Sequence, residues 1–256
     1  MNKLFDTHAH MDDRRLQRDF ESITKRLKNT VKRVLVPGVE PKDWQKILSI
    51  CEDPFYVAAL GIHPKEIDKI NEQVMERLDT LLRDERVVAL GEIGLDYYWR
   101  KDNLPEQEYW LRRQIRMAKE HGLPIILHDR EAHGSLKKVL DEEDPFATGV
   151  ILHAFSGSVE MALDYVKKGA YISMAGPITF QNAVMPKKVA AAVPLEHLLI
   201  ETDSPYLTPH PFRGKRNDPA KVIFVAEEIA RQKGLEVDEV IFQTTKNAEE
   251  VFGLAD

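Results

Sequence analysis

The sequence Leu4-Phe5-Asp6-Thr7-His8-Ala9-His10 opens the chain with an apolar pair that runs directly into a histidine cluster. Alternate side chains of an extended strand share a face, so Asp6, His8 and His10 are expected to point the same way. Two imidazoles at this spacing can reach one metal ion, although short histidine clusters also occur on solvated surfaces. The stretch therefore predicts a first strand with metal ligands at its end, if other segments supply partners.

Apolar and β-branched runs alternate with longer amphipathic segments in the rest of the chain, as in repeated βα units around a parallel sheet. The runs expected to form strands are Lys3 to His8, Arg33 to Gly38, Tyr56 to Ile62, Arg86 to Glu92, Leu123 to His128, Gly149 to His153, Ala170 to Met174 and His197 to Asp203. The expected helices are Leu16 to Lys28, Lys42 to Cys51, Asn71 to Arg83, Pro105 to Glu120, Glu131 to Asp144, Val159 to Lys168, Met185 to Ala192, Pro219 to Lys233 and Val237 to Phe252. Eight strands in 256 residues predict an α/β fold, a single-domain (β/α)8 TIM barrel over residues 1–256.

Composition limits the class of protein. The net charge of −6 is unlike that of proteins that coat nucleic acid by bulk electrostatics, so a nucleic-acid substrate needs a local basic site and a metal. The single cysteine, Cys51, excludes an intramolecular disulfide and a cysteine-based zinc site, and we expect it to be buried. With neither a signal peptide nor an apolar run of about 20 residues, we expect a soluble, cytoplasmic protein without membrane contact.

Polar side chains stand at the predicted C-terminal strand ends, where barrels of this class concentrate their chemistry. Glu92, for example, shares its expected inward parity with Leu90, and the same spacing of two relates His128, His153 and Asp203 to Ile126, Ile151 and Glu201. Buried imidazoles and carboxylates cost heavily unless they are paired, so a cation explains their convergence. The expected ligands of two divalent ions are His8, His10, Glu92, His128, His153 and Asp203, with Glu92 as the bridge. This donor set favours zinc, manganese, cobalt or iron over magnesium or calcium, and the sequence does not choose among the four.

Four segments of the sequence together resemble one known family. They are His8-Ala9-His10, Gly91-Glu92-Ile93-Gly94-Leu95-Asp96-Tyr97, His153-Ala154-Phe155-Ser156-Gly157 and Glu201-Thr202-Asp203-Ser204-Pro205. From Phe5 to about Phe252 the chain resembles the TatD family of metal-dependent deoxyribonucleases, within the amidohydrolase-type barrels. The resemblance implies that His8, His10 and Asp203 bind one metal, that Glu92 bridges, and that His128 and His153 hold the second.

The resemblance implies hydrolysis of phosphodiester bonds in DNA, as a 3′–5′ exonuclease on single strands or ends. Glu92 and Asp203 are the expected catalytic residues, and Asp203 is placed to orient the attacking water and take its proton. Two alternatives stay open. The same ions can activate water against a carbonyl, as in an amidohydrolase, a lactonase or a D-aminoacyl-tRNA deacylase. A non-catalytic binding protein on this barrel would lack some of the ligands, and here none is missing.

The residues expected to bind substrate lie near the same rim. They are His63, Arg130, Arg213 and Lys215, the last two in the basic loop that follows the eighth strand. Guanidinium and ammonium groups can grip phosphate there, although a solvated lid explains the loop equally well. The aromatic segment 97–99 is expected either to stack on unpaired bases or to cap the barrel.

Overall fold

The strands of the protein form one parallel barrel. The computed structural model describes residues 2–99 and 101–255, and over these residues eight strands pair in chain order. The strands are β1 (Leu4–Asp6), β2 (Val31–Gly38), β3 (Tyr56–Leu60), β4 (Val87–Asp96), β5 (Ile125–Arg130), β6 (Val150–Leu152), β7 (Tyr171–Met174) and β8 (Leu198–Ile200). The predicted single-domain (β/α)8 barrel is confirmed.

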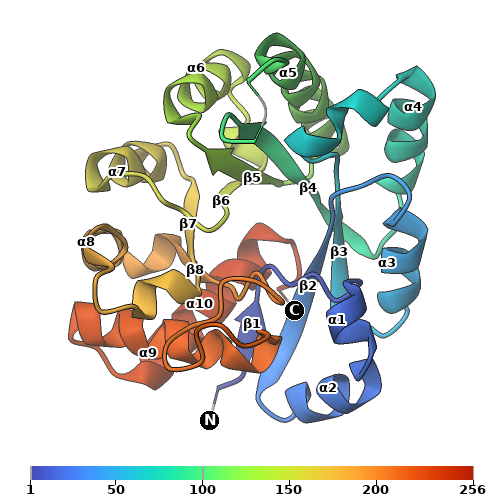
Figure 1. Ribbon diagram of the computed structural model, residues 1–256. Helices are drawn as coiled ribbons and strands as arrows, with labels where there is room; N and C mark the ends of the chain where they lie inside the picture. The colour runs from blue at the N-terminus through green and yellow to red at the C-terminus, as the bar shows by residue number, and fades with distance from the viewer. Residues whose placement is uncertain (1, 100, 256) are drawn as a thin grey trace.

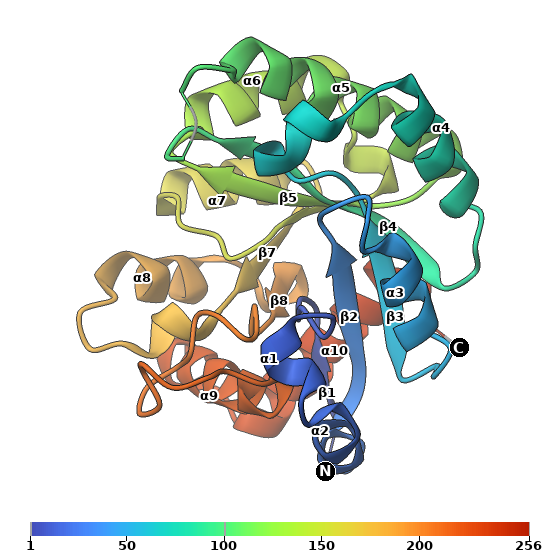
Figure 2. The ribbon, with the colours of Figure 1, turned by 45° about the vertical axis from the view of Figure 1, so that its right-hand side comes forward.

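Helices surround this barrel on its outside (Figures 1 and 2). They are α1 (Arg14–Gln17), α2 (Phe20–Leu27), α3 (Trp44–Ile50), α4 (Glu72–Leu81), α5 (Leu104–His121), α6 (His133–Glu143), α7 (Val159–Lys167), α8 (Val184–Ala192), α9 (Val222–Lys233) and α10 (Val237–Val251). Short 3-10 turns, among them η1 (Pro64–Lys69), lie in the loops. No helix in the described part of the chain is both long and apolar enough to cross a membrane.

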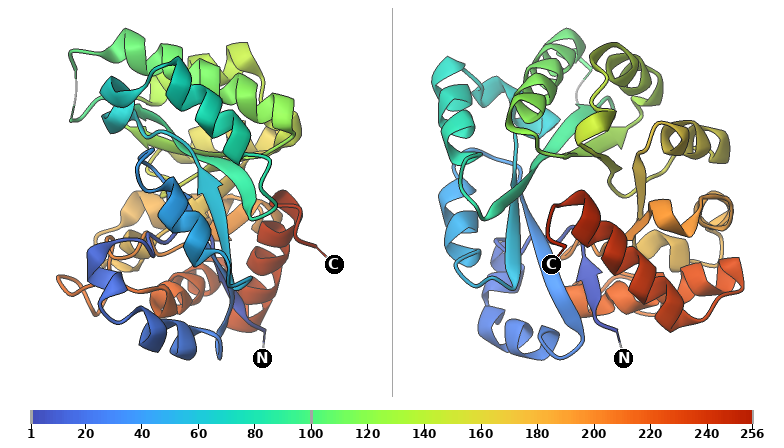
Figure 3. Two further views of the ribbon diagram at one scale, coloured as in Figure 1. Left: turned by 90° about the vertical axis from the view of Figure 1, so that its right-hand side faces the viewer. Right: turned by 180° about the vertical axis from the view of Figure 1, so that it is seen from behind.

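Two apolar layers hold the barrel together. The larger layer lies between the strands and the helices, and it includes the buried Cys51. The smaller layer fills the barrel interior with Phe5, Leu35, Val57, Ala59, Val88, Ala89, Ile126, Ile151 and Leu199. The end of α10 closes this interior, because Ala248 and Phe252 join the same cluster and the Phe252 ring lies 5.9 Å from that of Phe5. Figure 3 shows α10 across the back of the barrel, so the opposite end carries the open loops.

The barrel closes where its first and last strands meet. Beyond β1 and β8, the Thr7 N–H donates to the Ile200 carbonyl at 3.1 Å and the Asp203 N–H donates to the His8 carbonyl at 2.8 Å. The His10 N–H donates to the Ser204 carbonyl, also at 2.8 Å. These backbone bonds form a seam that joins the segment after β1 to the segment after β8 at the open rim.

Strand β4 departs from regular alternation and corrects one expectation. Its pairing shifts register twice, between Ala58 and Ala59 of its partner β3 and again around Gly91 to Ile93. As a result Ala89 faces the barrel interior, whereas Leu90 packs on the helix side. The expectation that Leu90 shares the inward parity of Glu92 is therefore wrong, because an irregular strand does not keep a period of two.

The predicted helix Leu16 to Lys28 is also corrected, since the segment forms two helices. Asp19 leaves the helical region with φ −134° and separates α1 from α2. The Asp19 carboxylate accepts two hydrogen bonds of 2.7 Å from Arg216. That partner lies 197 residues away, so the local apolar spacing carries no sign of the break.

Candidate metal centre

Six side chains predicted as ligands meet at the open rim. His8 and His10 follow β1 and Asp203 follows β8, which places these three at the seam. Glu92 lies on β4, His128 lies on β5, and His153 follows β6 directly. All six are buried or half-buried. Segments far apart in the sequence thus converge on one small volume.

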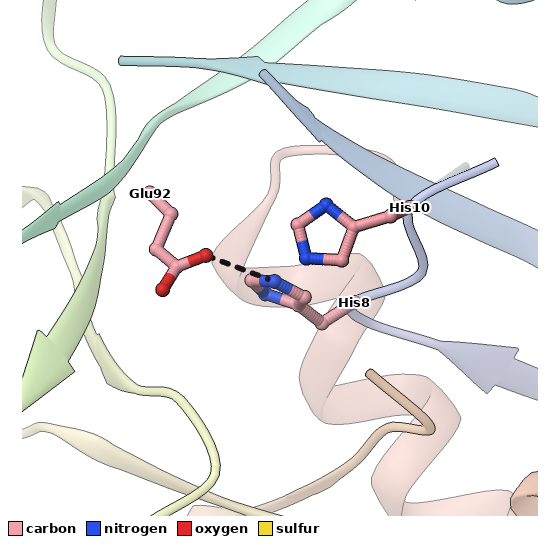
Figure 4. A group of neighbouring side chains, drawn as sticks. All are labelled: His8, His10 and Glu92. Carbon is pink, nitrogen blue, oxygen red and sulfur yellow. Dashed lines mark ion pairs between the residues drawn. The ribbon is translucent and has the colours of Figure 1, made fainter. Parts of the chain in front are cut away.

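Glu92 occupies the middle of this group. Figure 4 shows the Glu92 carboxylate directed at the His8 ring. Its Oε2 lies 3.3 Å from Nε2 of His8, and its Oε1 lies 2.9 Å from Nδ1 of His128. The same Oε1 lies 3.6 Å from Nε2 of His153. One carboxylate therefore faces histidines on two sides, which is the arrangement a bridging ligand requires.

Asp203 faces the histidines that follow β1. Its Oδ1 lies 3.3 Å from Nε2 of His10 and 3.8 Å from Nε2 of His8. The backbone of Asp203 has φ 52°, in the left-handed region that non-glycine residues rarely adopt. The bond from its N–H to the His8 carbonyl holds this conformation, so the seam itself positions the carboxylate.

Two residues outside the six predicted ligands, His63 and Glu201, also lie within ligand distance of them. The groups of donor atoms that lie within 4.8 Å of one another are His8–His10–Glu92, His8–His153–Glu201 and His63–Glu92–His128. Nδ1 of His63 accepts the Lys65 N–H at 3.1 Å, so the neutral ring carries its proton on Nε2, which points at Glu92 from 3.4 Å. Burial lowers the pKa of His63, which favours this neutral form. The ring is thus arranged to donate a hydrogen bond rather than to bind a metal.

Carboxylates behind the histidines fix their orientation. Oδ2 of Asp96 lies 3.1 Å from Nε2 of His128, and Oε1 of Glu201 lies 2.7 Å from Nδ1 of His153. Glu201 is itself held by the Ser173 hydroxyl at 2.5 Å. Such contacts set which imidazole nitrogen carries the proton and leave the other one for the centre. No role was predicted for Asp96, although its place four residues after Glu92 in the Gly91–Tyr97 motif is a signal that points to it.

Asp6 contacts Thr202 rather than a histidine ring. Its Oδ1 accepts the Thr202 N–H at 2.9 Å and its Oδ2 accepts the Thr202 hydroxyl at 2.6 Å. This contact ties the end of β1 to the segment that carries Asp203. Asp6 therefore supports the seam rather than the rings of the histidines.

Charges in the cluster are strongly coupled. Burial opposes ionisation of Glu92, yet the surrounding His153, His63 and His128 hold its pKa well below its usual range. Burial likewise opposes the charged form of His153, but Glu201 and Glu92 raise its pKa to about 10. The buried carboxylates thus require positive charge beside them, and a divalent cation supplies it when the imidazoles bind in their deprotonated form.

The residues present fit a pair of divalent ions. Both ring nitrogens of His8 are buried, and neither makes a well-aligned hydrogen bond within the described residues. A buried polar atom without such a bond is costly, and coordination removes that cost. The mixed imidazole and carboxylate donors suit zinc, manganese, cobalt or iron.

A cavity of about 450 Å³ opens over the centre. His10, Glu92, His128, His153 and Asp203 line its floor, and its rim includes His63, Lys65, Glu66, Trp99, Arg130, Tyr206 and Leu207. Its size lies within the range of small-molecule sites. The structure thus brings two of the four predicted substrate residues, His63 and Arg130, to the same cavity as the ligands.

Arg213 and Lys215 are not among the described residues that line this cavity. The Arg213 guanidinium lies 4.9 Å from the centroid of the Phe180 ring. The Lys215 backbone bonds within its own loop, where its carbonyl accepts the Thr208 hydroxyl at 2.6 Å. A phosphate-binding role for Arg213 and Lys215 stays a prediction.

Comparisons with known proteins agree with this geometry. The profile of the family described as TatD related DNase matches residues 5–253. The uncharacterized metal-dependent hydrolase YabD of Bacillus subtilis (strain 168) is 43% identical over 251 residues, covering 97% of this chain and 98% of YabD. The crystal structure of YjjV, a TatD homologue from Escherichia coli K12, superposes with a TM-score of 0.93 at 32% identity and covers 98% of each chain. A TatD-family hydrolase from Entamoeba histolytica shares the fold, with a TM-score of 0.86, 21% identity and 99% of each chain covered.

Proposed function

This chain belongs to the family of TatD-related DNases and is a metal-dependent hydrolase, and from that premise we propose that it hydrolyses phosphodiester bonds in DNA. The observation that carries the proposal is one cavity that joins the ligand clusters around Glu92 to the cationic side chains of Lys65 and Arg130. Carboxylates and imidazoles on the floor suit metal ions. Cations on the rim suit the phosphates on either side of the bond that is cut.

The ligands divide into two sets in this proposal. His8, His10 and Asp203 would hold one ion, and His128 and His153 would hold the other. Glu92 would bind both ions, which its position between the two groups of histidines supports. When bound, the two cations supply the charge that polarises a phosphoryl oxygen and lowers the pKa of a water molecule.

In this proposal the protein side chains orient the attacking water, accept its proton and bind the phosphates. Burial raises the pKa of Asp203, but His10 and His153 more than offset this and lower it, so the carboxylate is ionised at neutral pH. It lines the cavity and can align the attacking water and accept its proton. His63 lines the cavity, and its Nε2–H, 3.4 Å from Oε1 of Glu92, can also donate a hydrogen bond to a phosphate oxygen. Arg130 and Lys65 hold neighbouring phosphates from the rim.

We further propose that the substrate is the end of a single DNA strand, cut in the 3′–5′ direction. A cavity of about 450 Å³ suits a few groups of one strand rather than the full width of a duplex. The net charge of −6 also disfavours binding to long duplex through the general surface. The protein therefore binds DNA mainly at the cavity.

The test is a substrate panel with protein loaded with manganese or zinc. Single-stranded DNA, duplex DNA and RNA, each labelled at the 5′ end, are compared with ester, lactone and D-aminoacyl-tRNA substrates. We expect stepwise shortening of single-stranded DNA that Asp203→Asn reduces at least 100-fold. The control is Asp79→Asn, which removes a carboxylate that pairs with His121 at 2.7 Å outside the cavity lining. Turnover of carbonyl substrates alone would replace the nuclease proposal with the carbonyl hydrolase.

A further inference from the structure

The aromatic segment after β4 is divided by the structure into three different environments. Tyr97 is half-buried and its hydroxyl donates to Glu108 at 3.1 Å. Tyr98 lies against the Arg130 guanidinium, 4.1 Å from the ring centroid. Trp99 is 57% exposed and lines the cavity over the metal centre. Tyr98 is also exposed, but of the two it is Trp99 that lines the cavity and can therefore meet a substrate there.

The position of Trp99 is tied to the metal centre through Asp96. Oδ1 of Asp96 accepts the N–H groups of Tyr98 and Trp99 at 3.1 and 3.0 Å. Oδ2 of the same carboxylate lies 3.1 Å from Nε2 of His128. One buried side chain thus sets both the path of the aromatic segment and the orientation of a ligand.

Two cations stand beside the Trp99 ring. Lys65 Nζ lies 5.0 Å and the Arg130 guanidinium 5.6 Å from its centroid. Neither cation forms an ion pair with any carboxylate in the part of the chain that the structure describes. Their charges are therefore available to a ligand. An exposed aromatic ring flanked by available cations is how proteins bind single-stranded nucleic acid, with bases on the ring and phosphates on the cations.

Tyr206, another exposed aromatic residue that lines the cavity, lacks this combination. The cation beside its ring is Arg15, at 4.5 Å from the centroid, and Arg15 is held by Asp13 at 2.8 Å. The charge of Arg15 is thus already balanced. An exposed ring for a base and cations that can bind its phosphates therefore occur together on the Trp99 side of the cavity.

We propose that Trp99 is the stacking platform for one unpaired base of the DNA strand whose phosphodiester lies over the metal centre. Lys65 and Arg130 bind the phosphates that flank this base. The inference rests on the proposed nuclease function and adds its substrate determinant: the enzyme reads an unstacked base, which single strands and frayed ends offer and an intact duplex does not. It assigns Trp99 to substrate binding rather than to the bond-breaking step.

The test combines a change in the protein with a change in the DNA. Wild type and Trp99→Ala are assayed on octathymidylate and on a series of octamers in which one nucleoside at a time is replaced by an abasic tetrahydrofuran residue. We expect Trp99→Ala to lower kcat/KM on octathymidylate by about tenfold, mainly through KM. Removing the base at one position should lower wild-type kcat/KM similarly, and there Trp99→Ala should have no further effect. Trp99→Phe should restore most of the loss.

The matched control is Tyr109→Ala. Tyr109 is 52% exposed and lies 5.9 Å from the guanidinium of Arg113, so it has the same chemistry away from the cavity lining. We expect its kinetics to equal wild type on every octamer. If Trp99→Ala affects base-containing and abasic strands equally, or affects neither, the stacking proposal is overturned.

Fluorescence supplies a readout that does not depend on cleavage. Of the three tryptophans, Trp44 is fully buried and Trp110 is partly buried, so quenching by added octathymidylate reports mainly on Trp99. We expect quenching in wild type that disappears in Trp99→Phe, while the anisotropy of a labelled octamer still shows binding. If wild type cleaves neither octathymidylate nor the abasic octamers, the nuclease function is refuted. If octathymidylate also fails to quench the fluorescence of wild type, the stacking role of Trp99 is refuted independently.

Discussion

Replacement of Asp96 by asparagine should weaken metal binding without unfolding the barrel. In the native protein one carboxylate oxygen accepts two backbone N–H groups and the other faces Nε2 of His128. Asparagine keeps one acceptor oxygen but turns the other position into an amide donor. Whichever way the amide is oriented, a donor then faces either the imidazole or the backbone N–H groups, so one of the two contacts is lost.

The expected loss follows from that contact. If the amide faces His128, the imidazole must accept at Nε2 and moves its proton to Nδ1, the atom that lies 2.9 Å from Glu92. Nδ1 then cannot bind a metal. Replacement of a carboxylate behind a ligand histidine typically costs about 10- to 100-fold in affinity, or roughly 1.4 to 2.8 kcal/mol. Competition against a chromophoric chelator measures the affinity for zinc or manganese, and nitrogen NMR of the histidine rings reports the tautomer.

The control for this prediction is Asp79→Asn. Asp79 and His121 form the same kind of pair at 2.7 Å, on α4 and at the end of α5. We expect that variant to bind metal as wild type does. Wild-type affinity in Asp96→Asn, or an equal loss in both variants, would refute the reasoning.

Three further predictions concern the fold. Phe252→Ala should destabilise the protein by about 3 to 5 kcal/mol in urea unfolding, because it empties the closed end of the barrel, whereas the partly buried Leu254→Ala should cost less. Gly94→Ala should lower stability by about 3 kcal/mol and reduce metal content, since its Cβ would lie 2.0 Å from a carbonyl oxygen of β5; Gly122→Ala, with no atom within 4 Å, should bind metal normally. Glu143→Gln should cost about 1 kcal/mol at pH 7, because two arginines on α5 lower the pKa of this carboxyl. Stability from a lowered carboxyl pKa is present above the unfolded value of about 4.3 and is lost as pH falls through the folded value, so the two proteins should converge in acid. A constant difference across pH would contradict this.

The barrel and its ligands could be predicted because the signals are local. Each strand is a short apolar run, and ligands such as His128 and His153 stand at strand ends where the fold collects them. Alternation worked for His128, whose neighbour Ile126 faces the interior as expected. It failed for Leu90, because register shifts in β4 depend on pairing with β3 and β5 rather than on the sequence of β4 alone.

Long-range contacts explain the rest of what the sequence did not reveal. The Asp19 carboxylate, at the break between α1 and α2, accepts its hydrogen bonds from Arg216, which lies 197 residues away in the sequence. The loop that carries Arg213 is shaped by Asn217, whose amide donates to the carbonyls of Thr202 and Tyr206. None of these partners follows from spacing or composition. A residue type near a strand end therefore predicts ligands better than it predicts substrate contacts.

The seam between β1 and β8 has a consequence for protein synthesis. A ribosome adds Asp203 and the hydrogen-bond partners at Ile200 and Ser204 about 190 residues after His8 and His10. Before that point His8 and His10 lack the segment after β8 to which they bond. The end of α10, which closes the barrel interior, has not yet been synthesised either. A growing polypeptide that still lacks β8 and α10 therefore cannot assemble the hydrolytic centre.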